Sequence, residues 1–207
     1  MRLRASVLAV SLFLALGAQV PARSRISDAG SAALARQLAA AVERHDTPGV
    51  VSLVVDRDGV LFEAAAGKLD VERNLPMPTN AIFNIASMTK PVTSVAIMML
   101  LEEGRLRLDD PVSKYLTGFD NLQVITTFNE VDGSYQTRPA RRAMTIRHLL
   151  AHTSGIGYGF CNPIVARLQR GTQKSEWELP LLSDPGDQWN YSASTRVLGL
   201  VVEKIAG

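Results

Sequence analysis

The sequence has 207 residues, of which 46% are hydrophobic, enough for one domain of ordinary size with a sizeable core. Its formal net charge is +2, but two of the 22 basic residues, Arg2 and Arg4, lie in a stretch of 22 residues that contains no acid. Without that stretch, 20 basic residues balance 20 acidic ones, so charge gives no indication of nucleic-acid binding.

The first 22 residues have the pattern of a secretory signal peptide. A basic start, Met1 to Arg4, precedes an uncharged apolar run over residues 7–18, and small residues around Ala22 offer a cleavage point. The run is short for a membrane span, so we expect a secreted or periplasmic protein without a stable anchor after cleavage. An uncleaved N-terminal anchor is the alternative. Cys161 is the only cysteine, which excludes an internal disulfide and a cysteine-paired zinc site.

The N-terminal third predicts one helix and one hairpin. Asp28 can cap a helix over residues 29–44, and its expected buried face comprises Leu34, Leu38, Ala41 and Val42. A short β-branched segment, 50–55, and a second predicted strand, 60–66, flank a tight turn at Asp58-Gly59 and predict a β-hairpin. Residues 68–80 are expected to form a loop, because two prolines exclude a helix there.

A long helix is predicted over residues 92–101, opened by Ser87 and ended by Gly104. Pro91 fits its first turn, where a missing N–H is tolerated. The expected core stripe comprises Val92, Val95, Ala96, Met99 and Leu100. Other apolar residues fill most of the remaining circumference, which indicates a helix buried nearly all round.

Short elements and loops follow. A helical stretch is expected from Leu108 to about Leu116, and residues 126–142 appear as a polar, irregular surface excursion. The cluster of Arg138, Arg141 and Arg142 is interpreted as part of a solvated loop.

The C-terminal part predicts two further helices. Thr145 can cap a short helix through Leu150, and three glycines over residues 155–159 predict a flexible loop. Residues 179–188 form another loop, and the last helix is expected over 194–206. Its apolar face comprises Leu198, Val201, Val202 and Ile205.

Ser87 and Lys90 are three residues apart, so both side chains leave the same face of the first turn. A hydroxyl is a poor nucleophile until a base takes its proton. A lysine amine can be that base when burial or nearby positive charge lowers its pKa. The pair alone is equally well explained by a helix-capping serine beside a solvated lysine.

Four stretches together resemble the serine hydrolases of the β-lactamase type, which include class C β-lactamases, penicillin-binding proteins, D-amino-acid peptidases and esterases. They are residues 83–91 (FNIASMTKP), 106–112 (LRLDDPV), 145–155 (TIRHLLAHTSG) and 185–199 (PGDQWNYSASTRVLG). The resemblance covers most of the chain after Ala22. It implies an α/β (α+β) β-lactamase/DD-peptidase-like fold, with residues 23–207 as the N-terminal part of the hydrolase domain.

The resemblance also implies roles for three residues. Ser87 resembles the acylated nucleophile, Lys90 its base partner, and Tyr191 the tyrosine that moves a proton between nucleophile, leaving group and water. No metal or organic cofactor is implied. The substrate is expected to be a small ester, lactam or peptide, with no nucleic-acid partner, and oligomeric state is not predicted.

Two departures from the family pattern narrow the expectation. Where β-lactamases and penicillin-binding proteins have an asparagine that contacts the substrate amide, this chain has Ala193, and residues 157–160 resemble the esterase branch. The family's third motif, which supplies one N–H of the oxyanion hole, lies beyond Gly207. We therefore expect the N-terminal part of a larger enzyme, with most sheet strands missing.

Other candidate sites are weaker. His148 and His152 could suggest a metal pair, but Leu149 stands where a zinc-protease motif needs glutamate, so we expect one surface and one loop-fixing histidine. Ser154 lacks the preceding glycine of a nucleophile elbow. Asp109 and Asp110 are interpreted as caps of the following turn rather than paired catalytic carboxylates.

The sequence thus predicts an exported serine hydrolase that works through an acyl-enzyme at Ser87 and is esterase-like rather than lactamase-like. The alternative is a non-catalytic remnant, or a binding protein that keeps the cleft without turnover.

Overall fold

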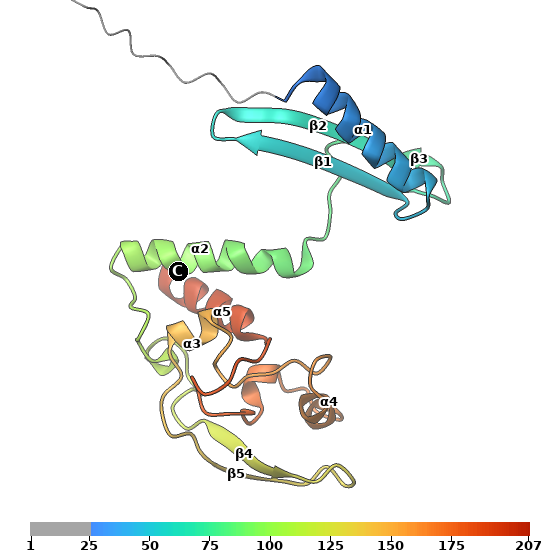
Figure 1. Ribbon diagram of the computed structural model, residues 1–207. Helices are drawn as coiled ribbons and strands as arrows, with labels where there is room; N and C mark the ends of the chain where they lie inside the picture. The colour runs from blue at the N-terminus through green and yellow to red at the C-terminus, as the bar shows by residue number, and fades with distance from the viewer. Residues whose placement is uncertain (1–25) are drawn as a thin grey trace, which may run out of the picture. The chain divides into compact units, whose positions relative to one another are not determined.

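The computed structural model describes residues 26–207, and the chain divides into two units between Asn84 and Ile85. The predicted signal peptide, residues 1–22, lies outside the described residues. The first unit contains a helix and a small sheet, and the second contains the other helices and a separate hairpin (Figure 1). All three residues predicted to be catalytic belong to the second unit.

The first unit begins with α1 (Asp28–Glu43), which packs against a three-stranded antiparallel sheet. The predicted cap at Asp28 is wrong, because the Ser27 hydroxyl accepts the N–H of Gly30 at 3.1 Å and Asp28 is already helical. Ser27 precedes an acidic first-turn residue, so the serine caps while the acid faces the helix dipole. Leu34 is 38% exposed, whereas the rest of the predicted face is half-buried.

The predicted hairpin is confirmed and is longer than expected. Strands β1 (Gly49–Asp56) and β2 (Gly59–Asp70) pair antiparallel from Gly49 opposite Gly67 to Asp56 opposite Gly59. The loop predicted over residues 68–80 is partly wrong, because β2 continues to Asp70 and pairs with the short strand β3 (Leu75–Pro76). A proline is tolerated there because β3 lies at the sheet edge.

The core of the second unit forms where α5 (Ser194–Ala206) contacts both α2 (Thr89–Glu102) and α3 (Ile146–Leu150) (Figure 1). The predicted bounds of α5 are confirmed. Its buried face includes Val197, Leu198 and Val201. Thr145 caps α3 as predicted, and His148 completes a capping box with it.

The predictions for α2 are only partly right. The helix is present, but a single turn of 3₁₀ helix (Ala86–Met88) precedes it, so Ser87 does not cap it. The face that packs on the core contains Ile97 and Leu100, whereas Val92 and Val95, in the predicted stripe, are exposed. The expectation of burial all round is therefore wrong within the described structure. With apolar residues on both faces, periodicity could not decide which face packs inward.

The predicted irregular excursion over residues 126–142 is also wrong. Strand β4 (Gln123–Phe128) pairs antiparallel with β5 (Tyr135–Pro139) in a hairpin at the end of the unit away from α2 (Figure 1). Four of the five residues of β5 are exposed, and two exposed threonines, Thr126 and Thr127, follow each other in β4, so the hairpin lacks the alternation by which strands are recognised.

Three further helical segments complete the second unit. Asn162 caps α4 (Pro163–Gln169), which was not predicted, and a single turn of 3₁₀ helix spans Glu176–Glu178. Another short 3₁₀ helix, Val112–Lys114, lies within the helical stretch predicted before Leu116. Along residues 26–207, no helix has the length and apolar character needed to cross a membrane.

The glycine-rich segment is packed rather than flexible, contrary to expectation. Residues 154–158 are buried, and Gly155, at φ +84°, lies so close to the Ser183 carbonyl that a Cβ would approach its oxygen to 2.3 Å. Glycine is therefore needed here for close backbone packing as well as for backbone conformation.

Candidate active site

Ser87 and Lys90 meet at the start of α2. Ser87 lies in the 3₁₀ turn before the helix, and Lys90 lies in the first helical turn. The Lys90 ammonium donates to Ser87 Oγ at 3.3 Å. The spacing of three residues therefore brings the amine and the hydroxyl together on one face, as the sequence predicts.

Tyr191 reaches the same point from the loop before α5. Its hydroxyl oxygen lies 2.6 Å from Ser87 Oγ, and either group can donate the hydrogen bond. Lys90 Nζ lies 4.6 Å from the centroid of the Tyr191 ring. The structure thus brings all three predicted residues together within the second unit.

The surroundings of Tyr191 favour its ionised form. The side-chain hydrogen bond with Lys90, followed by that with Ser87, lowers the pKa of Tyr191 below its ordinary value of 10.0. The positive charge of Lys90 acts in the same direction. A phenolate stabilised in this way can accept a proton from the serine hydroxyl that it already contacts.

Backbone strain is concentrated next to Ser87 and Tyr191. Among the described residues of the second unit, the two non-glycine residues with positive φ are Ala86, at 43°, and His152, at 55°. Ala86 directly precedes Ser87, and the His152 ring centroid lies 5.1 Å from that of Tyr191. A left-handed conformation costs a non-glycine residue about 1–2 kcal/mol, and such strain occurs preferentially at functional sites.

His152 fixes the loop that carries Tyr191. Its Nδ1 accepts the Ser192 N–H at 3.3 Å, and its carbonyl accepts the Asn190 N–H at 2.8 Å. Because Nδ1 is an acceptor, the neutral ring carries its proton on Nε2. Burial, aided by the charge of Lys90, lowers the pKa of His152, which favours this neutral form.

A chain of buried hydroxyls lies behind the histidine. Ser192 Oγ contacts Ser194 Oγ at 2.7 Å, and Ser194 Oγ contacts Ser154 Oγ at 2.8 Å. Ser154 also accepts the N–H of Ile156, and it is fully buried. Burial removes Ser154 from contact with substrate, in agreement with the weak nucleophile-elbow pattern around it.

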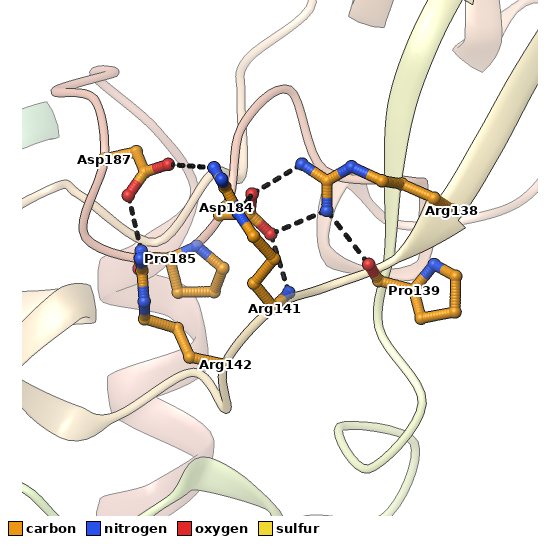
Figure 2. Close-up of polar contacts among 7 residues, drawn as sticks. All are labelled: Arg138, Pro139, Arg141, Arg142, Asp184, Pro185 and Asp187. Atoms are coloured by element: carbon orange, nitrogen blue, oxygen red, sulfur yellow. Dashed lines mark hydrogen bonds and ion pairs between the residues drawn. The ribbon is translucent and has the colours of Figure 1, made fainter.

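The arginine cluster forms an ion-pair network rather than a solvated loop, contrary to expectation (Figure 2). Arg138 donates to Asp184 Oδ1 at 3.0 Å, and Arg141 adds its side chain and its backbone N–H. Arg141 and Arg142 both contact Asp187. The Asp184 side chain is 1% exposed, and hydrogen bonds from Arg138 and Arg141 hold its pKa far below the ordinary range. These contacts fasten the loop that leads to Tyr191.

The two remaining acidic candidates are structural. Asp109 pairs with Arg147, while Asp110 accepts from Lys114, Tyr115 and the N–H of Arg107. The predicted capping of the following turn is wrong, because the residues that Asp110 contacts are an upstream backbone group and two side chains. Among the described residues, no group of three or more His, Cys, Asp or Glu side chains could hold a metal ion.

A cavity of about 500 Å³ lies beside the nucleophile, and both Ser87 and Lys90 line it. The aromatic residues Tyr158 and Phe160 and the basic residue Arg196 contribute to its lining. From the sequence, residues 157–160 are notable only for their resemblance to esterases, and no role is predicted for Arg196. The position of Arg196, five residues after Tyr191, was the available signal.

Comparison with known proteins identifies the family of the chain. The family model described as Beta-lactamase matches residues 34–207. Protein Rv1367c of Mycobacterium tuberculosis is 39% identical over 168 residues, which are 76% of this chain and 41% of that protein. Esterase EstB of Burkholderia gladioli is 33% identical over 174 residues, covering 77% of this chain and 41% of the esterase.

The chain is also similar to a protein of known structure. The unliganded selenomethionyl derivative of simvastatin synthase (LovD) from Aspergillus terreus superposes with a TM-score of 0.74 at 27% identity. The match covers 86% of this chain and 48% of the synthase. The chain therefore spans less than half the length of each of these three proteins.

Proposed function

The chain belongs to the beta-lactamase family, and from this premise we propose that it carries the acyl-transfer site of a serine hydrolase, with Ser87 as the nucleophile. The single observation that carries the proposal is the contact of Ser87 Oγ with both the Tyr191 hydroxyl, at 2.6 Å, and Lys90 Nζ, at 3.3 Å. A nucleophilic serine needs such partners, because its hydroxyl reacts only as its proton is removed.

Tyr191 is the proposed proton carrier. Ser87 Oγ forms a bond to the carbonyl carbon of an ester while its proton passes to the phenolate oxygen of Tyr191. The ester C–O bond then breaks, and the leaving alkoxide takes that proton from Tyr191. Water then attacks the carbonyl carbon of the acyl-enzyme while one of its protons passes to Tyr191. The bond to Ser87 Oγ breaks, Ser87 takes that proton from Tyr191, and the acid is released.

Lys90 is proposed to stabilise the charges that this exchange creates. Its ammonium contacts Ser87 Oγ and lies over the Tyr191 ring. It therefore stabilises the negative charge of the Tyr191 phenolate before attack and the negative charge that develops on Ser87 Oγ during attack. This role needs the Lys90 amine at its present distance from Ser87.

An ester is the proposed substrate, in preference to a lactam. Ala193 occupies the position at which β-lactamases and penicillin-binding proteins have an asparagine. Its side chain is apolar and fully buried, so it offers no polar contact to a substrate amide. The similarity to a protein named an esterase supports the same choice. Hydrolysis of a small ester, in which water accepts the acyl group, is the simplest reaction of this class.

Hydrolysis of p-nitrophenyl butyrate by the purified chain tests the proposal. We expect turnover that Ser87→Ala abolishes and that Ser94→Ala, a change in the same helix, leaves within about twofold. Circular dichroism checks that both variants fold. Equal turnover in Ser87→Ala and the unchanged protein would contradict the proposal, and so would absence of turnover in the folded, unchanged chain.

We also propose that the protein is exported by cleavage after residue 22. The support is the basic start, the uncharged apolar run and the small residues described above. Sequencing the N-terminus of the protein from the culture fluid or periplasm tests this, with Arg23 as the expected first residue. An intact Met1 in the cell interior would contradict it.

A further inference from the structure

The charged side chains that line the cavity beside Ser87 are all positive among the described residues. Its basic lining residues are Lys90 and Arg196, and no Asp or Glu is among the described residues that line it. Lys90 already contacts Ser87 and lies over the rings of Tyr158 and Tyr191. Arg196 is therefore the cation that remains available to a bound molecule.

Arg196 is in a suitable state to bind an anion. It lies in the first turn of α5, and its side chain is 63% exposed. Within residues 26–207, its ion pair is with Glu176, at an N–O distance of 3.6 Å, which is longer than a hydrogen bond. A guanidinium has five N–H donors in a planar fork that matches a carboxylate, and most of them remain unused in this contact.

The aromatic side of the cavity offers an apolar surface. The rings of Tyr158 and Phe160 stack with their centroids 4.8 Å apart and an angle of 27° between planes. Tyr158 is buried, whereas Phe160 is 78% exposed. Stacking fixes the exposed ring in place, so it can contact an apolar ligand without first losing much conformational freedom.

We propose that the acyl group transferred to Ser87 ends in a carboxylate, which Arg196 binds, and that its apolar body lies against Phe160. The substrate class is thus a monoester of a dicarboxylic acid. This inference rests on the proposed function, since it describes the ester on which Ser87 acts. A cavity of about 500 Å³ falls within the usual range for sites that bind small molecules.

The carboxylate takes no part in the bond changes. Ser87 Oγ bonds to the ester carbonyl carbon, the ester C–O bond breaks, and the alcohol leaves with the serine proton. The second carboxylate stays ionised throughout, so its contact with Arg196 contributes to binding and orientation. Arg196 is accordingly a specificity-determining residue rather than a proton carrier.

Two esters with acyl chains of equal length test the inference. Mono-p-nitrophenyl glutarate and p-nitrophenyl valerate both have five acyl carbons, and they differ by the terminal carboxylate. After subtraction of spontaneous hydrolysis, we expect a higher kcat/KM for the glutarate. Arg196→Gln should lower that value roughly tenfold, mainly through KM, while the valerate value stays within about twofold.

Control variants separate this effect from general damage. Arg196→Lys keeps the charge but loses the planar fork, so we expect partial retention of the glutarate preference. Arg170→Gln changes an exposed arginine outside the cavity and should leave both esters unaffected. In the unchanged protein, added salt should lower kcat/KM for the glutarate and not for the valerate.

The outcomes distinguish the two proposals. Turnover of neither ester by the unchanged protein would overturn the proposed function. Turnover of both with the same glutarate-to-valerate ratio in Arg196→Gln, or a preference for the neutral ester, would overturn the carboxylate inference and leave the proposed function standing.

Discussion

The hydroxyl oxygens of Ser87 and Tyr191 lie 2.6 Å apart, although the two residues are 104 positions apart in the sequence. Ser87 is placed by the turn that opens α2, and Tyr191 by the loop that His152 and the arginine network fasten. The contact depends on both segments, so changes at Tyr191, at Lys90 and in the fastening network have different expected effects.

Tyr191→Phe removes the hydroxyl and keeps the ring. Acylation of Ser87 by an activated ester should fall about 100- to 10,000-fold, because the serine loses its proton carrier. Stopped-flow release of p-nitrophenol measures the acylation rate. Tyr135→Phe, at an exposed tyrosine of β5, is the control and should change nothing. Acylation at the normal rate in folded Tyr191→Phe would contradict the role assigned to this hydroxyl.

Lys90→Ala removes the amine that contacts Ser87. We expect acylation to fall by a similar factor while circular dichroism stays unchanged, since Lys90 lies in the first turn of α2 and outside the core. Lys204→Ala, near the end of α5, serves as the matched surface change. The role of Lys90 would be refuted by acylation that continues unchanged in Lys90→Ala.

Asp184→Asn should weaken the loop before Tyr191. The Asp184 carboxylate is buried between Arg138 and Arg141, and a neutral side chain removes the counter-charge that the two arginines share, leaving Arg141 with Asp187 alone. The midpoint of thermal unfolding should drop more than in Asp109→Asn, which breaks an exposed ion pair with Arg147. Acylation should fall as well, since the loop positions Tyr191. Equal midpoints in the two variants would show that the network contributes nothing.

Asp110 should make stability depend on pH in acid. Hydrogen bonds from Lys114 and then Tyr115, with the N–H of Arg107, lower its pKa from 3.8 to about 2. Because the folded-state pKa is the lower one, this stabilisation is present above about pH 4 and is lost as pH falls toward 2. Urea unfolding should show the chain more stable than Asp110→Asn by about 1 kcal/mol at pH 6, with solvent screening taken into account. A difference that stays constant down to pH 2 would contradict this cause.

Gly155→Ala tests whether the glycine-rich segment is packed. Both Gly155 and Gly171 have positive φ, at 84° and 75°, but a Cβ has open space at Gly171 and meets the Ser183 carbonyl oxygen at 2.3 Å from Gly155. Gly171→Ala should cost about 1–2 kcal/mol of unfolding free energy from conformation alone. Gly155→Ala should cost clearly more or prevent folding. Equal losses, measured by urea denaturation, would mean that the segment is free to move.

The sequence was most informative where structure depends on neighbours along the chain. The hairpin around Asp58-Gly59 and the last helix follow from local turn chemistry and from apolar spacing, and both are confirmed. The Ser87–Lys90 spacing likewise predicts a contact within one helical turn, and the structure shows it. Tyr191 could be chosen through family resemblance and its place between Pro185-Gly186 and the last helix, because the residue alone does not differ from an aromatic core residue.

Features that depend on distant pairing could not be predicted. Asp184 lies 43 and 46 residues from its two arginine partners, so the cluster of basic residues looked solvated. The hairpin of β4 and β5 lacks an alternating pattern, and α2 is apolar on both faces. Arg196 could be identified as a candidate ligand-binding residue only from the structure, which places it in the cavity beside Ser87.

Mapping a fluorophosphonate adduct tests the central claim most directly. The purified protein is treated with the probe, and the modified residue is identified by peptide mass spectrometry, with Ser87→Ala treated in parallel. A single adduct on Ser87, absent from the variant and reduced in Tyr191→Phe, is the predicted result. An adduct on another serine, or none on the folded protein, would contradict the assignment of Ser87 as an activated nucleophile.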